Sequence, residues 1–449
     1  MKEKEFLPVL KEKHDIEELN AMQKKMLQVS SENKNIILLS PTGSGKTIAF
    51  ILPVLNLLRP SSGRIQVVVI APSRELVIQI AKVFGSLAEG FKVTELYGGH
   101  KVEDEVNSLS VVPDLVVATP GRLLDHIKRG NIDVAPVRIL VLDEFDKTLE
   151  LGFEEDVRKI VRRLKNVSRN ILTSATDADI LPDFLNLESP TVVSFLDGAE
   201  KVKKRMTVRR VVSSDKDKLE SLYALLNSLC LKKAERSIIF LNHRESAERV
   251  YNFLIKKHVD CSLYHGGLDQ QKREIAISLF NNGSRPILVA TDLAARGLDI
   301  ENVRNIVHYH QPLTPEVYTH RNGRTARVDR EGEIYLLVGK DEKVLEFIET
   351  EGDFIPEDGE KGNLKSGLET LIISSGKKEK VSKKDIVGFL IKEAHLEPQE
   401  IGKIEVFDHY SLAAVPKKEA TKIVELSRSL KLKGARRRIR IVDSLGPLA

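Results

Sequence analysis

Short apolar runs separated by helical patterns are the feature that most limits how this chain can fold. Before about residue 195 they occur at 35–40, 66–70, 114–118, 138–142 and 170–173. They lack the polar alternation of a strand with one wet face, so they predict a parallel sheet covered by helices on both faces. The same rhythm resumes at 237–241, 286–290, 305–309 and 333–338. We therefore expect two tandem α/β domains.

Two breaks in this pattern define the remaining organisation. A charged, weakly patterned segment at 198–205 predicts a hinge, and an acidic, glycine-containing stretch at 349–365 predicts a linker. Beyond it the pattern is strand, helix, two strands, helix and strand, which predicts a βαββαβ module. The expected domains are 1–200, 208–348 and 366–445.

The charge of the chain is concentrated near its end. The whole sequence carries a formal charge of +5, whereas residues 366–449 hold 17 Lys or Arg against 11 Asp or Glu, an excess of six. This local excess favours a polyanionic partner, and a solvated helical face is the alternative interpretation.

The sequence does not indicate a membrane protein or an exported protein. The longest apolar run, at 49–58, is far shorter than the roughly 20 residues of a membrane span. The N-terminus mixes both charge signs and shows no export signal, so we expect a cytoplasmic protein. Cys230 and Cys261 form neither a C-x-x-C pair nor a Cys/His cluster, which argues against a disulfide framework or a zinc site.

A glycine-rich loop lies between the first apolar strand and a helical run. Its residues are Ser40, Pro41, Thr42, Gly43, Ser44, Gly45, Lys46 and Thr47. Glycines let backbone amides surround phosphate oxygens, a lysine at this spacing reaches the β- and γ-phosphates, and the following hydroxyl binds Mg²⁺. The loop predicts ATP-type nucleotide binding, with a chance glycine-rich turn as the alternative, since Ser40 replaces the first glycine of the strict pattern.

Paired carboxylates follow a later strand. Asp143 and Glu144 stand just after the run at 138–142, with Asp146 close behind. Asp143 is suited to hold Mg²⁺ and Glu144 to orient an attacking water. Acidic pairs also commonly open helices, but the phosphate loop earlier in the chain favours the catalytic interpretation.

Further short blocks follow in order along the first domain. They comprise Phe6 and Gln23, Arg74, Gly98 and Gly99, the Thr119, Pro120, Gly121, Arg122 block, and Ser174 to Thr176. With the phosphate loop they resemble the DEAD-box ATP-dependent RNA helicases. The resemblance implies a RecA-like fold in which Phe6 and Gln23 read adenine and Ser174 and Thr176 couple nucleotide state to RNA. It assigns the other blocks to the RNA backbone. Two departures are the missing prolines before Gln23 and Phe145, where the family has Ala.

The second domain continues the resemblance. The RNA-binding positions it implies are Asn242, Arg244, Gln270, Arg273 and Thr291. Asp299 is implied on the ribose side of the nucleotide, and His320 in a link with the Asp146 region. Phosphoryl transfer needs positive charge opposite the phosphate loop, and the candidates are Arg324 and Arg327. Surface salt bridges, or a core hydrogen bond for His320, are the alternatives.

The C-terminal module resembles the RRM-like RNA-binding domain of DbpA-type helicases, which implies ribosomal RNA as a target. The segments 401–407, 411–416 and 431–434 carry the likeness. The usual aromatic RNP1 signature is absent, so stacking of bases on the sheet is not predicted. The candidate RNA contacts are instead the basic residues Lys431, Lys433, Arg436, Arg437, Arg438 and Arg440.

The expected function is RNA-stimulated ATP hydrolysis that locally separates RNA duplexes, with ATP and Mg²⁺ as cofactors and ribosome assembly as the setting. Two alternatives stay open. One is a clamp that holds RNA without productive turnover, suggested by Phe145, and the other is a DNA helicase of the wider superfamily.

Overall fold

The computed structural model describes most of the chain. The described residues are 3–41, 43–99, 102–175, 183–185, 187–196, 206–215, 217–231, 235–295, 300, 303–325, 332–356, 362–429 and 431–442, with the backbone alone for residues 3–5 and 295. The predicted hinge at 198–205 lies outside them. The first domain is one compact unit, and the second domain with the C-terminal module forms another.

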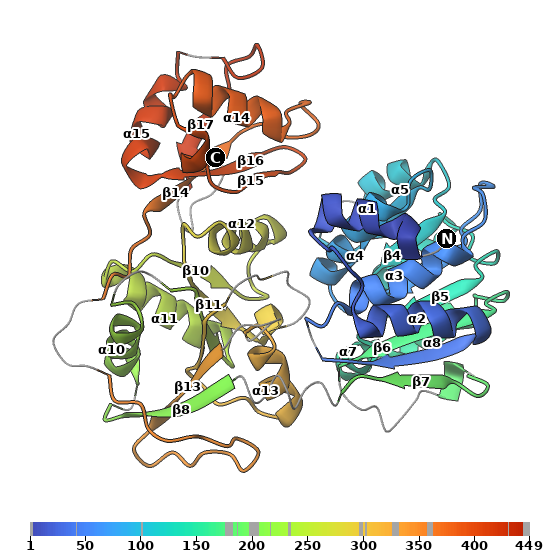
Figure 1. The fold of residues 1–449 in the computed structure, drawn as a ribbon, viewed down its shortest axis with the longest axis horizontal. Coiled ribbons are helices and arrows are strands. Elements are labelled where there is room, and N and C mark those ends of the chain that lie inside the picture. The colour runs from blue at the N-terminus through green and yellow to red at the C-terminus, as the bar shows by residue number, and fades with distance from the viewer. Residues whose placement is uncertain are drawn as a thin grey trace. The chain divides into compact units, whose positions relative to one another are not determined.

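The described part of the first domain is built on a seven-stranded parallel sheet of order β3-β4-β2-β5-β6-β1-β7 (Figure 1). The strands are β1 (Asn35–Leu39), β2 (Val67–Ile70), β3 (Val93–Leu96), β4 (Leu115–Ala118), β5 (Ile139–Leu142), β6 (Arg169–Ser174) and β7 (Thr191–Ser194). The helices are α1 (Glu3–His14), α2 (Ala21–Glu32), α3 (Lys46–Leu57), α4 (Arg74–Leu87), α5 (Val102–Leu109), α6 (Pro120–Lys128), α7 (Phe145–Glu150) and α8 (Glu154–Val161), with a short 3₁₀ turn η1 (Asp183–Leu185).

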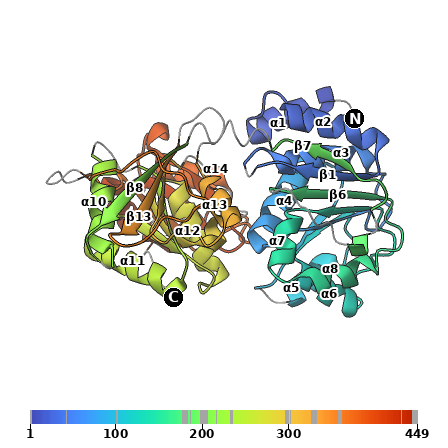
Figure 2. The same cartoon turned by 90° about the horizontal axis from the view of Figure 1, so that it is seen from below.

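Helices cover both faces of this sheet, as Figure 2 shows for α2 and α3 on one side and α6 and α8 on the other. Successive residues of a central strand point to opposite faces. In β2, Val67 and Val69 join the core beneath α2, α3 and α4, whereas Val68 and Ile70 join the core above α6 and α8. Both faces of the sheet are therefore buried, which explains the unbroken apolar runs in the sequence.

The second domain repeats this plan. Its strands are β8 (Met206–Ser213), β9 (Ser237–Leu241), β10 (Cys261–Tyr264), β11 (Ile287–Thr291), β12 (Asn305–His308) and β13 (Gly332–Gly339). Its helices are α10 (Leu219–Leu229), α11 (Arg244–Lys256), α12 (Gln270–Asn281) and α13 (Pro315–Asn322), with the turn η2 (Asp292–Ala295). The parallel order β10-β11-β9-β12-β13-β8 corresponds strand for strand to β3-β4-β2-β5-β6-β1.

The C-terminal module has the predicted βαββαβ order. It consists of β14 (Leu368–Ile373), α14 (Lys383–Lys392), the turn η3 (Pro398–Glu400), β15 (Ile404–Val406), β16 (Ser411–Pro416), α15 (Lys417–Leu426) and β17 (Ile439–Ile441). The antiparallel order is β15-β16-β14-β17. One sheet face packs on α14 and α15 through residues such as Leu371, Ala413 and Ile439.

The described part of the acidic stretch at 349–365 is held against the second domain. The backbone amide of Glu351 donates to Val208 O and that of Phe354 to Arg210 O, both at 2.7 Å, while Arg210 pairs with Asp353 at 2.7 Å. The predicted linker thus runs partly along the edge strand β8. Among the helices described, none has the length and apolar character needed to cross a membrane.

Candidate nucleotide and RNA site

The phosphate loop joins β1 to α3 through two left-handed glycines. Gly43 has φ +76° and Gly45 has φ +91°, a region that disfavours residues with a Cβ. A Cβ on Gly45 would lie 2.8 Å from Gln23 Nε2. Lys46 follows at the start of α3, with only 7% of its surface exposed, and its Nζ donates to Ser40 O at 2.8 Å. The two left-handed glycines and the buried Lys46 therefore lie together between β1 and α3.

The start of α2 is tied to this loop. Asn20 caps the helix, with Gln23 N donating to Asn20 Oδ1 and Asn20 N to Gln23 Oε1, both at 2.9 Å. Asn20 Nδ2 also donates to Ser44 O at 3.0 Å, and Gln23 Nε2 to Gly45 O at 3.4 Å. Asn20 was missed by the sequence reasoning, although its spacing to Gln23 is that of a capping box. Phe6 is buried in the core of the first domain.

The paired carboxylates lie at the carboxyl end of β5. Asp143 is 3% exposed and accepts a hydrogen bond from Thr173 Oγ1 at 2.5 Å. Burial raises the pKa of Asp143, while the Thr173 bond and the charge of Lys46 act in the opposite direction. Glu144 has φ +45°, a strained conformation for a residue with a side chain, and its amide donates to Thr173 Oγ1 at 3.1 Å.

Strand order brings these groups to one edge of the sheet. β6 pairs with β5 on one side and β1 on the other, and Ser40 N donates to Ser174 O at 3.0 Å. The ends of β5, β6 and β1 therefore carry the carboxylates, Ser174 and the phosphate loop together. A cation favours the charged form of a buried carboxylate, so Asp143 with Thr47 suits Mg²⁺, and Lys46 suits the phosphates.

Phe145 points into the protein interior. Its side chain is 2% exposed and joins the core that contains Leu142, Leu172 and Ile160. The larger ring is thus accommodated by packing beneath α7.

Phe145→Ala is expected to destabilise the first domain by about 3–5 kcal/mol, because it removes a buried ring and leaves a cavity. The measurement is hydrogen exchange in urea of peptides from β5 and β6, which reports this domain alone. Phe145→Leu, which keeps most of the buried volume, should cost less. Equal exchange in the Ala variant and the unaltered protein would contradict this packing role.

The blocks of the first domain that the sequence analysis predicts to contact RNA lie at the other half of the same edge. β4 pairs with β3 and β2, and these strands lead into Thr119, Gly98 and Arg74 respectively. Arg74 lies against the glycine pair, since a Cβ on Gly99 would approach its Nη1 to within van der Waals overlap. Thr119 and Pro120 begin α6. One half of this edge of the sheet therefore carries the residues predicted to bind the nucleotide, and the other half carries those predicted to contact RNA.

Arg122 is held by a buried carboxylate that the sequence analysis did not identify. Glu105 on α5 is 3% exposed and accepts from Arg122 Nε at 2.5 Å. It also contacts His126 Nε2 at 2.7 Å and accepts from Tyr97 N at 2.9 Å. This network fixes the first turn of α6 next to the segment that leads from β3 to Gly98.

The second domain has a similar arrangement at the ends of β10, β11 and β9. Arg244 begins α11 and lies against Gly266 and Gly267, where a Cβ on Gly266 would be 3.3 Å from its Nη2. Thr291 ends β11, while Gln270 and Arg273 lie in the first turn of α12. The predicted RNA positions of this domain, including Asn242 directly after β9, are therefore gathered on one edge, although the described side-chain contacts of Asn242 are internal.

Asn242 belongs to a network around Arg321. Arg321 is fully buried, and its Nε donates to Asp292 Oδ1 at 2.5 Å, its Nη2 to Asn242 Oδ1 at 2.7 Å and its Nη1 to His310 O at 2.9 Å. His320 and Arg324, in the same block of sequence, are also buried. Arg321 was not predicted, although its place in the His320 to Arg327 block was a usable signal.

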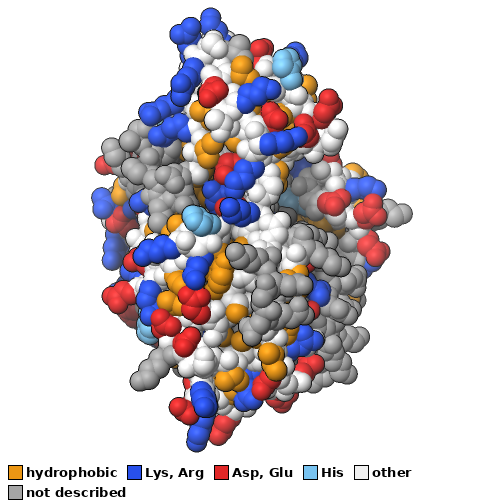
Figure 3. Space-filling model, turned by 90° about the vertical axis from the view of Figure 1, so that its left-hand side faces the viewer, with side chains coloured by type: hydrophobic (Ala, Val, Ile, Leu, Met, Phe, Trp, Pro, Cys, Tyr) orange, Lys and Arg blue, Asp and Glu red, His pale blue; other side chains and the backbone are white. Residues whose placement is uncertain are grey.

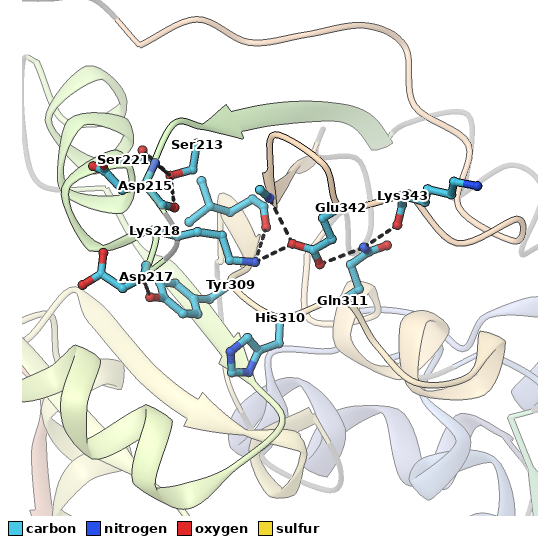
Figure 4. Close-up of polar contacts among 12 residues, drawn as sticks. Ser213, Asp215, Asp217, Lys218, Ser221, Tyr309, His310, Gln311, Glu342 and Lys343 are labelled. Carbon is cyan, nitrogen blue, oxygen red and sulfur yellow. Dashed lines mark hydrogen bonds and ion pairs between the residues drawn. The ribbon is translucent and has the colours of Figure 1, made fainter.

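At the edge of the second domain that corresponds to the nucleotide half, Lys218, Glu342 and Gln311 form a polar network (Figure 4). Lys218 follows β8 and is the N-cap residue of α10, at the topological position that Lys46 has after β1. Its Nζ donates to Glu342 Oε2 at 2.9 Å and to Leu337 O at 3.1 Å. Glu342 also accepts from Gln311 at 2.9 Å. Burial, with the charge of Lys218 as the next cause, lowers the pKa of His310 to about 4. The Lys218–Glu342 ion pair, in which the Glu342 side chain is 36% exposed, thus lies at this position.

The basic residues of the C-terminal module lie in a folded loop against the segment before α14. Lys433 Nζ contacts the carbonyl of Lys380 and pairs with Asp385 at 3.0 Å, while Ser374 Oγ donates to Arg438 O at 3.2 Å. This brings a second set of exposed lysines alongside, which the sequence reasoning missed: Lys377, Lys378, Lys380, Lys383 and Lys384. We call the segments 377–384 and 431–438 the basic rim. Lys and Arg side chains are plentiful on the module, at the top of Figure 3.

Four predicted site residues fall outside the described residues. They are Thr42, Thr176, Asp299 and Arg327.

Comparison with known proteins agrees with this arrangement. The DEAD/DEAH box helicase family model matches residues 20–181, the helicase conserved C-terminal domain model 217–329 and the DbpA RNA binding domain model 370–441. DEAD-box ATP-dependent RNA helicase CshA of Geobacillus kaustophilus is 34% identical over 333 residues, covering 72% of this chain and 69% of that protein. RhpA of Helicobacter pylori is 34% identical over 321 residues, covering 71% of this chain and 64% of that protein.

A solved structure shows the same fold. S. cerevisiae Dbp5 bound to RNA and ADP BeF3 has a TM-score of 0.66 and 25% sequence identity, covering 75% of this chain and 88% of that chain. The chain belongs to the DEAD-box ATP-dependent RNA helicases. The predicted fold class, two RecA-like parallel-sheet domains and a small antiparallel module, is thereby confirmed.

Proposed function

We propose that the protein hydrolyses ATP when RNA binds and uses the cycle to separate short RNA duplexes locally. The observation that carries this proposal is the divided edge of the first sheet. The strands β5, β6 and β1 hold the nucleotide candidates, and β3, β4 and β2 hold the RNA candidates. A single rigid sheet therefore supports both groups, which suits a coupling between phosphate state and RNA contact.

The chemistry assigned to the nucleotide half follows from its residues. Lys46 and the loop amides bind the phosphates, and Thr47 and Asp143 hold Mg²⁺, which neutralises charge that develops on the transferred group. Glu144 orients the attacking water. Because Phe145 lies in the core and not at this edge, it gives no reason to favour a clamp without turnover.

ATP hydrolysis measured without nucleic acid, with single-stranded RNA and with matched DNA tests the proposal. RNA alone should stimulate the rate strongly. Absence of hydrolysis under all three conditions would leave the clamp, and equal stimulation by DNA would leave the DNA helicase.

We further propose that the basic rim directs the protein to structured ribosomal RNA, in the setting of ribosome assembly. The similarity to the DbpA RNA binding domain supports the ligand class, and the exposed Lys and Arg residues of the rim supply phosphate contacts. Arginine also stacks on unpaired bases, which suits an RNA loop.

Replacing Lys431, Arg436 and Arg437 together by Gln is expected to weaken binding to ribosomal RNA hairpins and to flatten its dependence on salt, because fewer counterions are released. Affinity should be titrated at two salt concentrations. A matched control removes the same charge elsewhere on the module, at Lys392, Lys418 and Lys422. If both triple variants behave alike, the rim has no specific role.

A further inference from the structure

Glu105 of α5 joins two blocks of the first domain that the sequence analysis predicts to contact RNA. Its Oε1 accepts from Tyr97 N at 2.9 Å, directly before the glycine pair 98–99. Its Oε2 accepts from Arg122 Nε at 2.5 Å, in the block that begins α6. Figure 2 shows α5 beside α6. One carboxylate therefore bridges the segment after β3 and the first turn of α6.

The carboxylate is buried, whereas the arginine that it holds reaches the surface. Glu105 is 3% exposed, and 13% of the Arg122 side chain is exposed. His126 Nε2 also lies 2.7 Å from Glu105 Oε2 and donates to it, because a carboxylate only accepts hydrogen bonds. The opposite ring nitrogen of His126 accepts from Asn131 Nδ2 at 3.0 Å. Glu105 is thus fixed by its neighbours, and Arg122 is the member of the pair that an RNA phosphate can reach.

A neutral side chain of the same shape cannot replace this carboxylate. Tyr97 N and Arg122 Nε are both donors, and they bind different oxygens of Glu105. A glutamine has one acceptor oxygen and one NH₂ group, so either orientation of its amide turns a donor toward a donor. Glu105→Gln would therefore fit the same space and still lose one side of the bridge.

A third predicted RNA block meets the segment that Glu105 anchors. Arg74 begins α4 after β2, and a Cβ on Gly98 would lie 3.6 Å from its Nη2. Groups that follow β2, β3 and β4 are thus assembled around one buried carboxylate. An arginine whose side chain is already held loses less conformational freedom when it binds a phosphate.

We propose that Glu105 is a positioning residue, which holds the Arg122 guanidinium beside the glycine pair 98–99 in the arrangement that binds an RNA phosphate. Glu105 itself does not contact RNA. This inference rests on the proposed function, in which Arg122 and the glycine pair contact the RNA backbone.

The direction of the change in RNA affinity separates positioning from simple electrostatics. Removing a negative charge near a polyanion strengthens its binding by itself. Positioning predicts the opposite for Glu105→Gln, because Arg122 loses its fixed orientation. The RNA concentration for half-maximal ATPase stimulation should rise about tenfold, the effect of one lost hydrogen bond to a charged group, with the rate at saturating RNA unchanged. The slope of log affinity against log salt should fall by about 0.7, the value for one phosphate contact with a single strand.

Asp114→Asn is the matched control, because it also removes a buried carboxylate at β3. Asp114 is 2% exposed and accepts from Lys92 N at 3.0 Å directly before β3, as Glu105 accepts from Tyr97 N directly after it. It lies at the opposite end of the strands from the predicted RNA residues. The control should keep the RNA affinity and salt slope of the unaltered protein, and both variants should bind ATP normally without RNA. Equal weakening of RNA binding in both variants would show a general loss of packing.

Arg122→Ala tests whether Glu105 acts through the arginine. The loss of RNA affinity in the double variant, Glu105→Gln with Arg122→Ala, should be smaller than the product of the two single losses, since both substitutions remove the same contact.

The outcomes separate two failures. If the unaltered protein shows no RNA-stimulated hydrolysis, the proposed function fails. If it is stimulated but Glu105→Gln binds RNA as tightly as before or more tightly, or the two single losses multiply fully, the positioning role is wrong.

Discussion

Glu144→Gln is expected to reduce ATP hydrolysis by about 10²- to 10⁴-fold while nucleotide and RNA binding persist. The amide has the shape of the carboxylate but cannot assist the attacking water as a base. The anchor of this segment, Glu144 N to Thr173 Oγ1, uses the backbone and is retained. The measurements are steady-state hydrolysis and binding of a fluorescent ATP analogue with and without RNA. Hydrolysis at the original rate would show that another group positions the water.

Lys46→Ala provides the contrast. Removing this charge should weaken nucleotide binding itself, because no other described side chain occupies its place at the start of α3. Its contact with Ser40 O is also lost, so the melting temperature must be measured for both variants. If Lys46→Ala lost hydrolysis but still bound the nucleotide normally, Lys46 would act in hydrolysis and not in binding, contrary to the role assigned to it.

In the two RecA-like sheets the central strands could be predicted and the edge strands could not. All strands missed by the sequence analysis, β3, β7, β8 and β10, lie at sheet edges. In β3 and β7 exposed positions interrupt the apolar run, and such a four-residue segment has neither a continuous apolar signal nor a long alternation. The interior strands are buried on both faces, and that burial is what an unbroken run reports.

In the candidate site, too, some features could be predicted from the sequence and others could not. Residues that act through the backbone, such as Gly43 and Gly45, could be located because their spacing and flanking strand determine the geometry. Side chains that hold others in place could not. Thr173 on Asp143 and Glu105 on Arg122 meet across strands or helices, with no local pattern to indicate the pair.

The two sheets show how one fold serves different chemistry. Equivalent positions after β1 and β8 both carry a lysine at the start of a helix. Lys46 follows a glycine loop, whereas Lys218 has φ +56° and pairs with Glu342. A carboxylate already occupies the partner position of Lys218, so the second domain offers no comparable place for phosphate. We therefore expect one nucleotide per chain and assign to the second domain the stabilisation of the transition state.

Arg327→Ala is expected to lower RNA-stimulated hydrolysis by about 10³- to 10⁵-fold, the usual contribution of an arginine finger. The proposed cycle needs positive charge opposite the phosphate loop, and the resemblance assigns it to Arg324 and Arg327. Arg324 is 4% exposed, so its removal would also disturb packing, which makes Arg327 the better probe. Arg327→Lys keeps the charge but loses the planar fork that binds phosphate oxygens at two points, so it should recover little activity. ATP binding in the absence of RNA should be unchanged, because the phosphate loop belongs to the first domain. Full stimulated activity in Arg327→Ala would show that the second domain does not complete the catalytic site through this residue.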